Sequence, residues 1–316
     1  MRPIVTITMN PALDIATATD VIIPSTKLRC DEPRYDPGGG GINVARAAHM
    51  LGVEALAVFP IGGGSGQMIK MLVRREGVPH VAVPIEGITR ESLAVVERRS
   101  GKQYRFLLPG PPLSAADRKR CLDALASHAV GTTFIVASGS LPPGVPHDFY
   151  REIGAIAESC GGRFVLDTSG EALAGTDCSI FMIKASLREL EQLRGEAIAN
   201  EAAQERAAQA VVSEGRCEVL VVSLGAEGAL LATKSGCQRL PAVRVSALSS
   251  IGAGDSMLAG ILVALARGWA LPEAVRYGIA AGSAAVLRPG TELCRRDDTD
   301  RLYGEIRFHG ALAHPV

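Results

Sequence analysis

The chain has 316 residues, of which 47% are apolar and 21% are charged, and its 33 basic residues balance 33 acidic ones. This composition is ordinary for a globular protein and excludes wholesale disorder. Charges of one sign form no long run, so neither a nucleic acid nor a membrane surface is expected as a partner.

Seven cysteines are scattered along the chain without a close pair, which argues against a disulfide framework and against a zinc site. The N-terminal residues lack the apolar region and cleavage site of a signal peptide. The most apolar later stretch, residues 257–266, is too short to cross a bilayer. We therefore expect a cytoplasmic protein that acts on small molecules.

Short β-branched runs alternate with alanine-rich helical stretches along most of the chain. The pattern predicts strands at residues 4–9, 55–59, 134–137, 163–166, 180–183 and 219–222. It predicts helices at residues 43–51, 67–76, 115–127, 148–160, 187–193, 201–213, 255–267 and 272–286. This alternation indicates an α/β fold with a mostly parallel sheet covered by helices on both faces, followed by a loose tail over residues 308–316.

Two segments break this rhythm, residues 14–35 and residues 92–108, where polar and apolar residues alternate with no helix between. They predict either a small antiparallel sheet that projects from the main domain or a β-hairpin that lies on its surface. The pattern alone leaves both readings open.

Small or polar residues follow most of the expected strands, and they include Asp14, Ser138 and Lys184. In open α/β sheets, ligands bind in the crevice beyond the carboxyl ends of the strands. The sequence therefore predicts a binding site where these loops converge.

The run Gly252-Ala253-Gly254-Asp255 opens an expected helix. The free N–H groups of a first helical turn attract phosphate oxygens, and glycine lets a ligand approach the backbone closely. Asp255 in that turn can accept a proton from an incoming hydroxyl group. The run therefore suits phosphoryl transfer, although these four residues alone equally fit an ordinary glycine-rich turn.

Four consecutive glycines, Gly38 to Gly41, precede Asn43 and an amphipathic helix. They indicate close backbone approach to a polyhydroxylated ligand, with a flexible hinge as the alternative. The chain contains no complete Walker A or Rossmann glycine fingerprint, which disfavours a P-loop enzyme and a nicotinamide-dependent dehydrogenase.

Eight stretches together carry a family resemblance: residues 8–14, 27–30, 37–47, 103–106, 138–144, 167–173, 221–225 and 251–256. The chain resembles the ribokinase-like (PfkB) carbohydrate kinases from about residue 3 to residue 303. Within them it is most similar to the minor-type (isozyme 2) bacterial 6-phosphofructokinases. The resemblance implies a ribokinase-like three-layer sandwich, with residues 1–316 forming a single kinase domain. A small β-sheet lid, inserted at about residues 13–36 and 90–109, would clasp the lid of a second subunit in a homodimer.

The implied activity is ATP-dependent phosphorylation of the 1-hydroxyl group of fructose 6-phosphate to fructose 1,6-bisphosphate, with Mg²⁺. Alternatives in the same class are a tagatose-6-phosphate kinase and a 1-phosphofructokinase. A sugar-phosphate sensor without turnover is the alternative outside it.

The resemblance also implies a role for each matched residue. Asp255 would be the base, beside Gly252, Ala253 and Gly254 as the anion hole. Substrate would be bound by Asp14, Lys27 of the neighbouring subunit, Gly38, Gly39, Gly40, Asn43, Arg90 and Ser138. The nucleotide would lie across Lys184, Ser186, Ser223, Gly225, Gly228 and Ser283, with Glu189 holding Mg²⁺ through water. A monovalent cation such as K⁺ would lie near Ser249, Ile251, Ala285, Arg288 and Gly290.

The chain departs from the family pattern at two places. Ser186 stands where relatives have an asparagine that reaches the nucleotide phosphates, and residues 287–292 carry charged side chains in the loop that helps to bind the cation. The second departure weakens the expectation of a cation site. It also suggests the hypothesis that Arg288 supplies positive charge in place of the cation.

Overall fold

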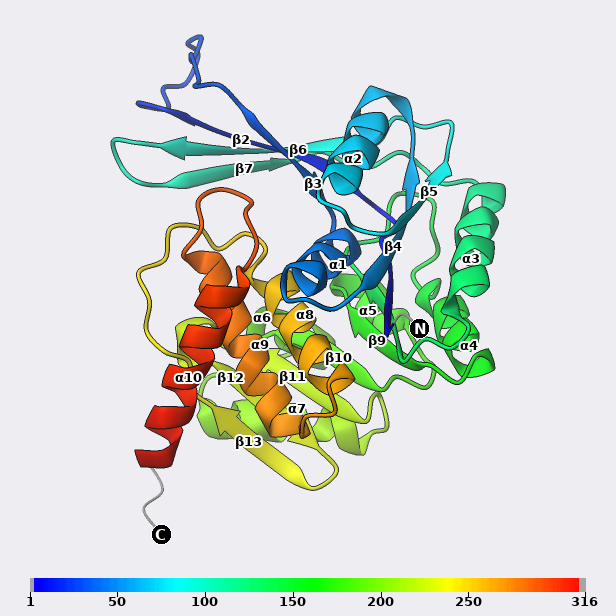
Figure 1. Ribbon diagram of the computed structural model, residues 1–316, viewed down its shortest axis with the longest axis vertical. Coiled ribbons are helices and arrows are strands. Elements are labelled where there is room, and N and C mark those ends of the chain that lie inside the picture. The colour runs from blue at the N-terminus through cyan, green and yellow to red at the C-terminus, as the bar shows by residue number, and fades with distance from the viewer. Residues whose placement is uncertain (1–2, 313–316) are drawn as a thin grey trace.

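The computed structural model describes residues 3–312. Within them, a nine-stranded main sheet has the order β13-β12-β11-β10-β9-β8-β1-β4-β5 (Figure 1). Seven of its strands run parallel, and the last two strands along the chain are antiparallel at one edge. The parallel strands are β1 (Ile4–Ile7), β4 (Ala55–Ile61), β5 (His80–Pro84), β8 (Phe134–Ser138), β9 (Arg163–Asp167), β10 (Met182–Ser186) and β11 (Val219–Ser223). The antiparallel strands are β12 (Ala229–Thr233) and β13 (Gly236–Leu240).

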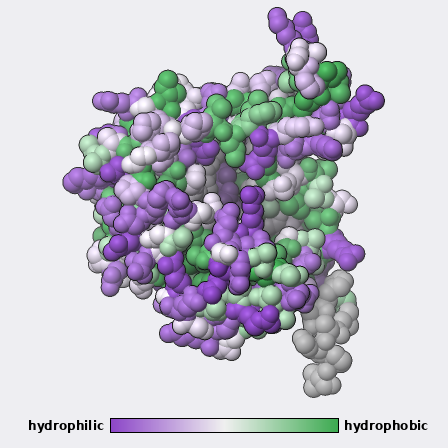
Figure 2. All heavy atoms as spheres, turned by 180° about the vertical axis from the view of Figure 1, so that it is seen from behind, coloured by the Kyte–Doolittle hydropathy of each residue, from purple (hydrophilic) through white to green (hydrophobic). Residues whose placement is uncertain are grey.

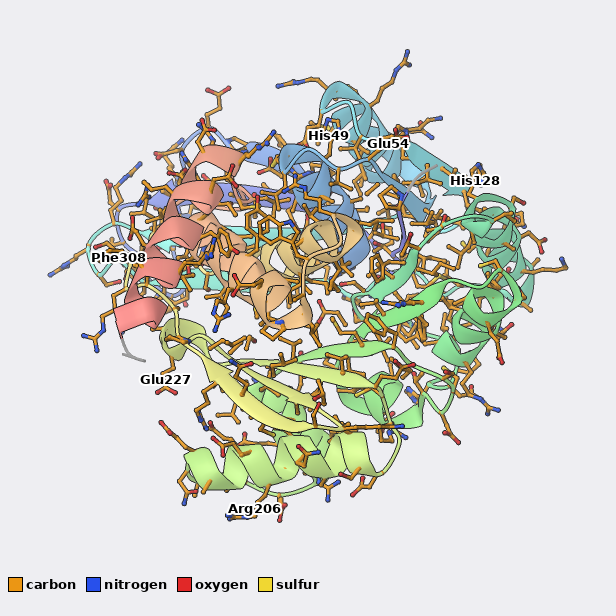
Figure 3. The ribbon with its side chains drawn as sticks, turned by 60° about the horizontal axis from the view of Figure 1, so that its bottom comes forward. His49, Glu54, His128, Arg206, Glu227 and Phe308 are labelled. Atoms are coloured by element: carbon orange, nitrogen blue, oxygen red, sulfur yellow. The ribbon has the colours of Figure 1, made fainter. Side chains whose placement is uncertain are left out.

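Helices cover both faces of this sheet, and each face has its own apolar core. The first core is closed by α1 (Gly40–Met50), α2 (Gly63–Arg75), α8 (Ala253–Ala266), α9 (Leu271–Val286) and α10 (Arg296–Leu312). The second is closed by α3 (Ala115–Ala129), α4 (Tyr150–Ser159), α5 (Gly170–Gly175), α6 (Leu187–Arg194) and α7 (Glu201–Ser213). Figure 3 shows the sheet between Arg206 on α7 and Phe308 on α10. The three-layer α/β prediction is confirmed.

A second, four-stranded sheet projects from this body (Figure 1). Its order is β3 (Arg34–Gly38), β2 (Ala12–Thr19), β6 (Arg90–Glu97) and β7 (Gln103–Leu107). The first of the two open readings is therefore right, because both irregular segments pair in one sheet. The sheet is not wholly antiparallel, since β2 and β6 pair in parallel. Both strands follow strands of the parallel main sheet, so both run outward from the same edge.

Most expected elements lie where the sequence placed them, with three differences of note. Helix α10 continues through residue 312, so the loose tail expected from residue 308 is wrong for residues 308–312, and residues 313–316 lie outside the described part. The helix is held because Leu302 and Ile306 pack into the first core. The strand expected at 180–183 is β10, displaced toward its C-terminus by its pairing with β11. Strands β5 and β13 and helices α5 and α10 were not expected.

The position of β1 places the candidate site. From β1, the chain builds the sheet toward β4 and β5 on one side and later toward β8 to β11 on the other. Such a topological switch point opens a crevice beyond the carboxyl ends of the adjacent strands. In this molecule the small sheet projects over that crevice. None of the helices in residues 3–312 is both long enough and apolar enough to span a membrane.

Candidate active site

A cavity of about 370 Å³, called here the polar cavity, lies beyond the ends of β8, β9 and β10. Its walls come from the small sheet, the N-terminus of α1, these strand ends and the turn before α8. The side chains that concern its chemistry are Asp14, Arg90, Ser92, Arg105, Asn43, Ser138, Asp167, Lys184, Glu189 and Asp255, together with the backbone at Gly39, Gly40, Ile251 and Gly252.

A second cavity of about 570 Å³, called the apolar cavity, lies on the other side of the turn before α8. Its lining includes Ser223, Gly225, Gly228 and Ser283, four of the residues expected around a nucleotide. The remaining lining is mainly aliphatic, from residues 242–247 and from α8 and α9.

The run Gly252–Asp255 is the wall between the two cavities. Gly252 and Asp255 face the polar cavity, whereas Ala253 and Gly254 face the apolar one. A group held by this turn is therefore within reach of ligands from both sides.

Backbone geometry favours glycine at position 252, and close packing favours it at position 254. Gly252 has a φ of 74°, and a methyl group there would come within 2.6 Å of Leu293 Cδ2. A methyl group at Gly254 would come within 2.8 Å of Lys184 Nζ. Because Ala253 to Asp255 form the first turn of α8, their N–H groups have no partner within the helix. The positive end of the helix dipole is thus presented between the cavities.

Asp255 is largely enclosed by protein and faces only the polar cavity. Burial raises the pKa of its carboxyl group to about 6, and the nearby Asp167 carboxylate adds to the rise. The Asn43 amide, which donates from Nδ2 to Asp255 Oδ2 at 3.0 Å, and the Lys184 ammonium oppose it. A carboxyl group with such a pKa is ionised at neutral pH and can still accept a proton, as a general base must.

Asp167 and Lys184 form a buried pair beside Asp255. The Lys184 Nζ atom lies 3.1 Å from Asp167 Oδ1, and the Ser138 hydroxyl donates to Asp167 Oδ2 at 3.2 Å. Burial lowers the pKa of Lys184, but the carboxylates of Asp167, Asp255 and Glu189 outweigh it and leave the pKa above its ordinary value. Lys184 is therefore a fixed positive charge. Asp167 was missed as a functional residue, although its place directly after a buried strand was a signal for it.

The small sheet contributes Asp14 and two arginines. Burial raises the pKa of Asp14 to about 6, and the positive charges of Arg105 and Arg90 limit the rise. Arg90 is held in place because its Nε and Nη2 atoms donate to the backbone oxygen of Asn10, at 3.3 and 3.1 Å. Arg105 and Ser92 were not expected to be site residues. Arg105 lies within the family stretch 103–106, which was the available signal for it.

The four-glycine run packs closely against other residues of the site. A methyl group at Gly38 would come within 2.2 Å of the Asp14 carboxylate, and one at Gly40 within 2.2 Å of Ser138 Oγ. The glycines therefore let α1 approach other residues of the site. Gly38 itself does not line the polar cavity, whereas Gly39 and Gly40 do.

Ser186 and Glu189 form a capping box at the start of α6. The Ser186 backbone N–H and hydroxyl both donate to Glu189 Oε2, at 2.6 and 2.9 Å, and the Glu189 N–H donates to the Ser186 hydroxyl at 3.3 Å. Glu189 lines the polar cavity, whereas Ser186 lines neither cavity. The spacing S-x-x-E is a sequence signature of this cap, so this structural role was visible in the sequence.

The residues expected around a monovalent cation are only partly together. The Ser249 hydroxyl donates to the Gly290 carbonyl at 2.7 Å and accepts from the Ile251 N–H at 3.2 Å, and Ala285 is buried in α9. Arg288 points elsewhere, because it forms an ion pair with Asp298 and lines neither cavity. The hypothesis that Arg288 supplies positive charge in place of the cation is therefore not supported by its position. No group of three or more His, Cys, Asp or Glu side chains in residues 3–312 is arranged to hold a metal ion.

Lys27 lies outside the site formed by its own chain. It is exposed in the segment between β2 and β3 and lines neither cavity. Figure 2 shows the small sheet from behind, as a projection whose surface mixes hydrophilic and hydrophobic residues.

Comparison with known proteins agrees with this geometry. The model of the pfkB family carbohydrate kinases matches residues 7–298. The chain belongs to this family. PfkB carbohydrate kinases transfer a phosphoryl group, and two cavities separated by a turn with free backbone N–H groups suit such a reaction.

Curated relatives in the PfkB family cover nearly the whole chain. The ATP-dependent 6-phosphofructokinase isozyme 2 of Mycobacterium tuberculosis is 49% identical over 300 residues, which are 95% of this chain and 88% of the relative. The protein of the same name from Escherichia coli K12 is 41% identical over 308 residues, covering 97% of this chain and 99% of the relative. A 1-phosphofructokinase of Xanthomonas campestris is 34% identical over 266 residues, covering 83% of each.

Solved structures of the Escherichia coli phosphofructokinase-2 share the whole fold. Its complex with potassium has a TM-score of 0.93 at 40% identity, and its complex with fructose-6-phosphate has a TM-score of 0.91 at 39% identity. Each covers 97% of this chain and 100% of the other. A further structure of the same protein, with a TM-score of 0.91, is described as its tetrameric inhibited form.

Proposed function

We propose that this enzyme transfers the γ-phosphoryl group of ATP to the 1-hydroxyl group of fructose 6-phosphate and so forms fructose 1,6-bisphosphate. The observation that carries the proposal is the position of Asp255, on a helix-opening turn between a polar and an apolar cavity. The polar cavity suits a sugar phosphate, and the aliphatic one suits a nucleotide base.

Asp255 is the proposed base. It takes the proton of the sugar hydroxyl as the oxygen attacks the γ-phosphorus, the new O–P bond forms, and the bond from the γ-phosphorus to the bridging oxygen of ADP breaks. The N–H groups of Ala253 to Asp255 and the Lys184 ammonium face the charge that is transferred. Because these donors are fixed before the substrates bind, they need no reorganisation during the reaction.

Binding of the sugar phosphate is assigned to the other side of the polar cavity. Asp14, Gly39 and Asn43 offer partners for the hydroxyl groups, and Ser138 and Arg90 offer donors for the 6-phosphate. Arg105 adds a second guanidinium group on the same side. Two guanidinium groups can bind a phosphate through several parallel hydrogen bonds.

The nucleotide is assigned to the apolar cavity, against Ser223, Gly225, Gly228 and Ser283. Glu189 is suited to hold Mg²⁺ through water, because it lines the polar cavity and both bonds from Ser186 go to Oε2, which leaves Oε1 for a metal-bound water. Mg²⁺, when bound, neutralises part of the phosphate charge.

A monovalent cation is part of the proposal. Its donors would be the oxygen atoms of Ser249 and Gly290, and the pairing of Arg288 with Asp298 removes a positive charge that would oppose it. Replacing K⁺ by choline in the assay is then expected to lower turnover, and an unchanged rate would remove the cation from the proposal.

The small sheet is proposed to act as a lid within one kinase domain and as the contact of a homodimer. It carries exposed apolar side chains, Phe106, Leu107 and Leu108, which are each more than half exposed in the single chain. A patch of this kind is typical of a surface that a second subunit covers. Lys27 would then reach the polar cavity of the partner.

A substrate panel tests the activity. Fructose 6-phosphate, tagatose 6-phosphate and fructose 1-phosphate are each offered with ATP and with GTP, and ADP or GDP is quantified directly. We expect the highest kcat/KM with fructose 6-phosphate and ATP, because the relatives named for that activity share more of this sequence than the reported 1-phosphofructokinase. A clear preference for another acceptor would assign the enzyme to that acceptor instead.

The sensor alternative is separated by the same panel. Tight binding of a sugar phosphate with no nucleotide diphosphate formed would favour it. The Asp255→Asn variant is expected to bind both ligands and to lose about a thousandfold in kcat, since a general base contributes factors of about 10² to 10⁴. Near-normal turnover by that variant would contradict the assignment of the base.

A further inference from the structure

We infer that Arg46 is a positioning residue for this reaction: it fixes the orientation of the Asn43 amide, and the amide in turn holds Asp255 as a carboxylate. The inference rests on the proposed role of Asp255 as the base. Arg46 itself lines neither cavity.

Arg46 is an arginine enclosed inside the protein, with only 2% of its side chain exposed. Its Nε and Nη2 atoms both donate to the carboxylate of Glu76, each at 2.7 Å. Its Nη1 atom donates to the Pro37 carbonyl at 2.9 Å and to Asn43 Oδ1 at 3.1 Å. The Asp36 carboxylate lies 3.9 Å from Nη2. The guanidinium plane is therefore fixed from several sides.

This fixed plane determines which way the Asn43 amide faces. A guanidinium group offers only donors, so the amide must turn its oxygen toward Arg46. Its NH₂ group then faces Asp255, to which Nδ2 donates at 3.0 Å. With the amide reversed, Oδ1 would face the Asp255 carboxylate and repel it. Arg46 therefore selects the only amide orientation that stabilises the ionised base.

The Asn43 contact matters because the other neighbours of Asp255 shift the pKa of its carboxyl group in opposite directions. Asp167 on β9 and Asp14 on β2 oppose its ionisation, while Lys184 on β10 favours it but is shared with Asp167. Arg46 also faces Asp14 and favours its carboxylate form. A hydrogen bond to the charged form of a buried carboxyl group lowers its pKa, so losing the Asn43 donor is expected to raise it.

A double-mutant cycle tests the inference. Lysine at position 46 keeps the charge but carries its N–H donors on one nitrogen, which cannot span Glu76 and Asn43 as the three guanidinium nitrogens do. We expect Arg46→Lys to move the acid limb of the kcat–pH profile upward by about one pH unit, which lowers kcat about tenfold at pH 5 but only about twofold at pH 7, so kcat is compared at pH 5. Asn43→Ala is expected to move the limb by a similar amount. Adding Arg46→Lys to Asn43→Ala should then change kcat less than twofold.

If the factors by which the two single variants lower kcat multiply in the double variant, the inference is overturned. Arg46 would then act by a route other than Asn43. The matched control is Arg239→Lys. Arg239 is also bound through its fork, to Glu205 and Gln204, and it lines neither cavity. Its variant is expected to keep the wild-type pH profile, and the same shift in that variant would mark the effect as general loosening of the fold.

A second variant keeps the test decisive if Arg46→Lys does not fold. The Glu76 side chain is 28% exposed, so the fold should tolerate Glu76→Gln. The change removes the negative charge of Glu76 and weakens its hydrogen bonds with Arg46. The acid limb is expected to move in the same direction by a few tenths of a pH unit, and an unchanged limb would overturn the inference. Failure of the proposed function would be seen in the wild-type protein, which would then not turn over the substrates. Failure of the inference would be seen only in the variants.

Discussion

Replacing Asp255 with asparagine is expected to stabilise the fold while it removes catalysis. The pKa of this carboxyl group is raised from 3.8 to about 6 by burial and by Asp167. The folded state therefore binds the proton more tightly than the unfolded chain does, and stability from this group is lost as the pH rises from 3.8 through 6. Above that window the wild type keeps an ionised carboxylate in an unfavourable place, whereas an amide of the same size carries no charge.

The size of the effect follows from the same values. A rise from 3.8 to about 6 corresponds to a cost of up to about 3 kcal/mol at neutral pH, at 1.36 kcal/mol per pH unit. At pH 5, where the carboxyl group is mostly protonated in the folded state, the difference falls to about 1.5 kcal/mol. For a chain of 316 residues, 3 kcal/mol amounts to an increase of about 4 °C in Tm.

Thermal unfolding of both proteins at pH 7.5 and pH 5, at one protein concentration and without ligands, measures this difference. The control is Asp123→Asn, because Asp123 is exposed on α3 and pairs with Lys119 at the surface. That change should cost no more than about 0.5 kcal/mol, without a gain that grows with pH. An Asp255→Asn variant that melts no higher than the wild type at pH 7.5, or whose gain is equal at the two pH values, would refute the reasoning.

Three further predictions concern the walls of the site and the small sheet. Gly40→Ala places a methyl group 2.2 Å from the hydroxyl at the end of β8 and should lower kcat/KM at least a hundredfold, whereas Gly64→Ala, which meets nothing within 4 Å, should leave it within twofold. Steady-state kinetics of the two variants would contradict this if they lost activity equally. Arg105→Ala should raise KM for the sugar phosphate about tenfold or more with a smaller change in kcat, and an unchanged KM would exclude Arg105 from phosphate binding. Phe106→Asp should shift the protein toward monomer in sedimentation velocity, while Val130→Asp, at a site that is 80% exposed, should not; a Phe106→Asp variant that sediments like the wild type would contradict the proposed contact through the small sheet.

The local pattern of the chain determined most of the backbone. Apolar strands, helical spacing and turn residues act over a few neighbours, so the alternation of strands and helices could be predicted directly. Local features also predicted where the site lies, namely the polar strand ends and the turn at Gly252–Asp255. Parallel strands all end on one side of a sheet, so the residues that follow them converge. The capping box at Ser186 and Glu189 is equally local, because the spacing S-x-x-E predicts it from the sequence alone.

Contacts between distant residues were decided by the tertiary structure. Nothing local shows that the glycine run is needed to pack against Asp14 and Ser138, or that Arg288 turns away to Asp298. Arg46 is a clear case, since an arginine within an alanine-rich helix is ordinarily exposed. It is buried here because the fold brings Glu76 to its Nε and Nη2 atoms, while Asn43, one turn earlier on the same helix, accepts from Nη1. The sequence thus determined where the reacting carboxylate stands along the chain, while the long-range side-chain partners that set its charge exist only after the sheet has assembled.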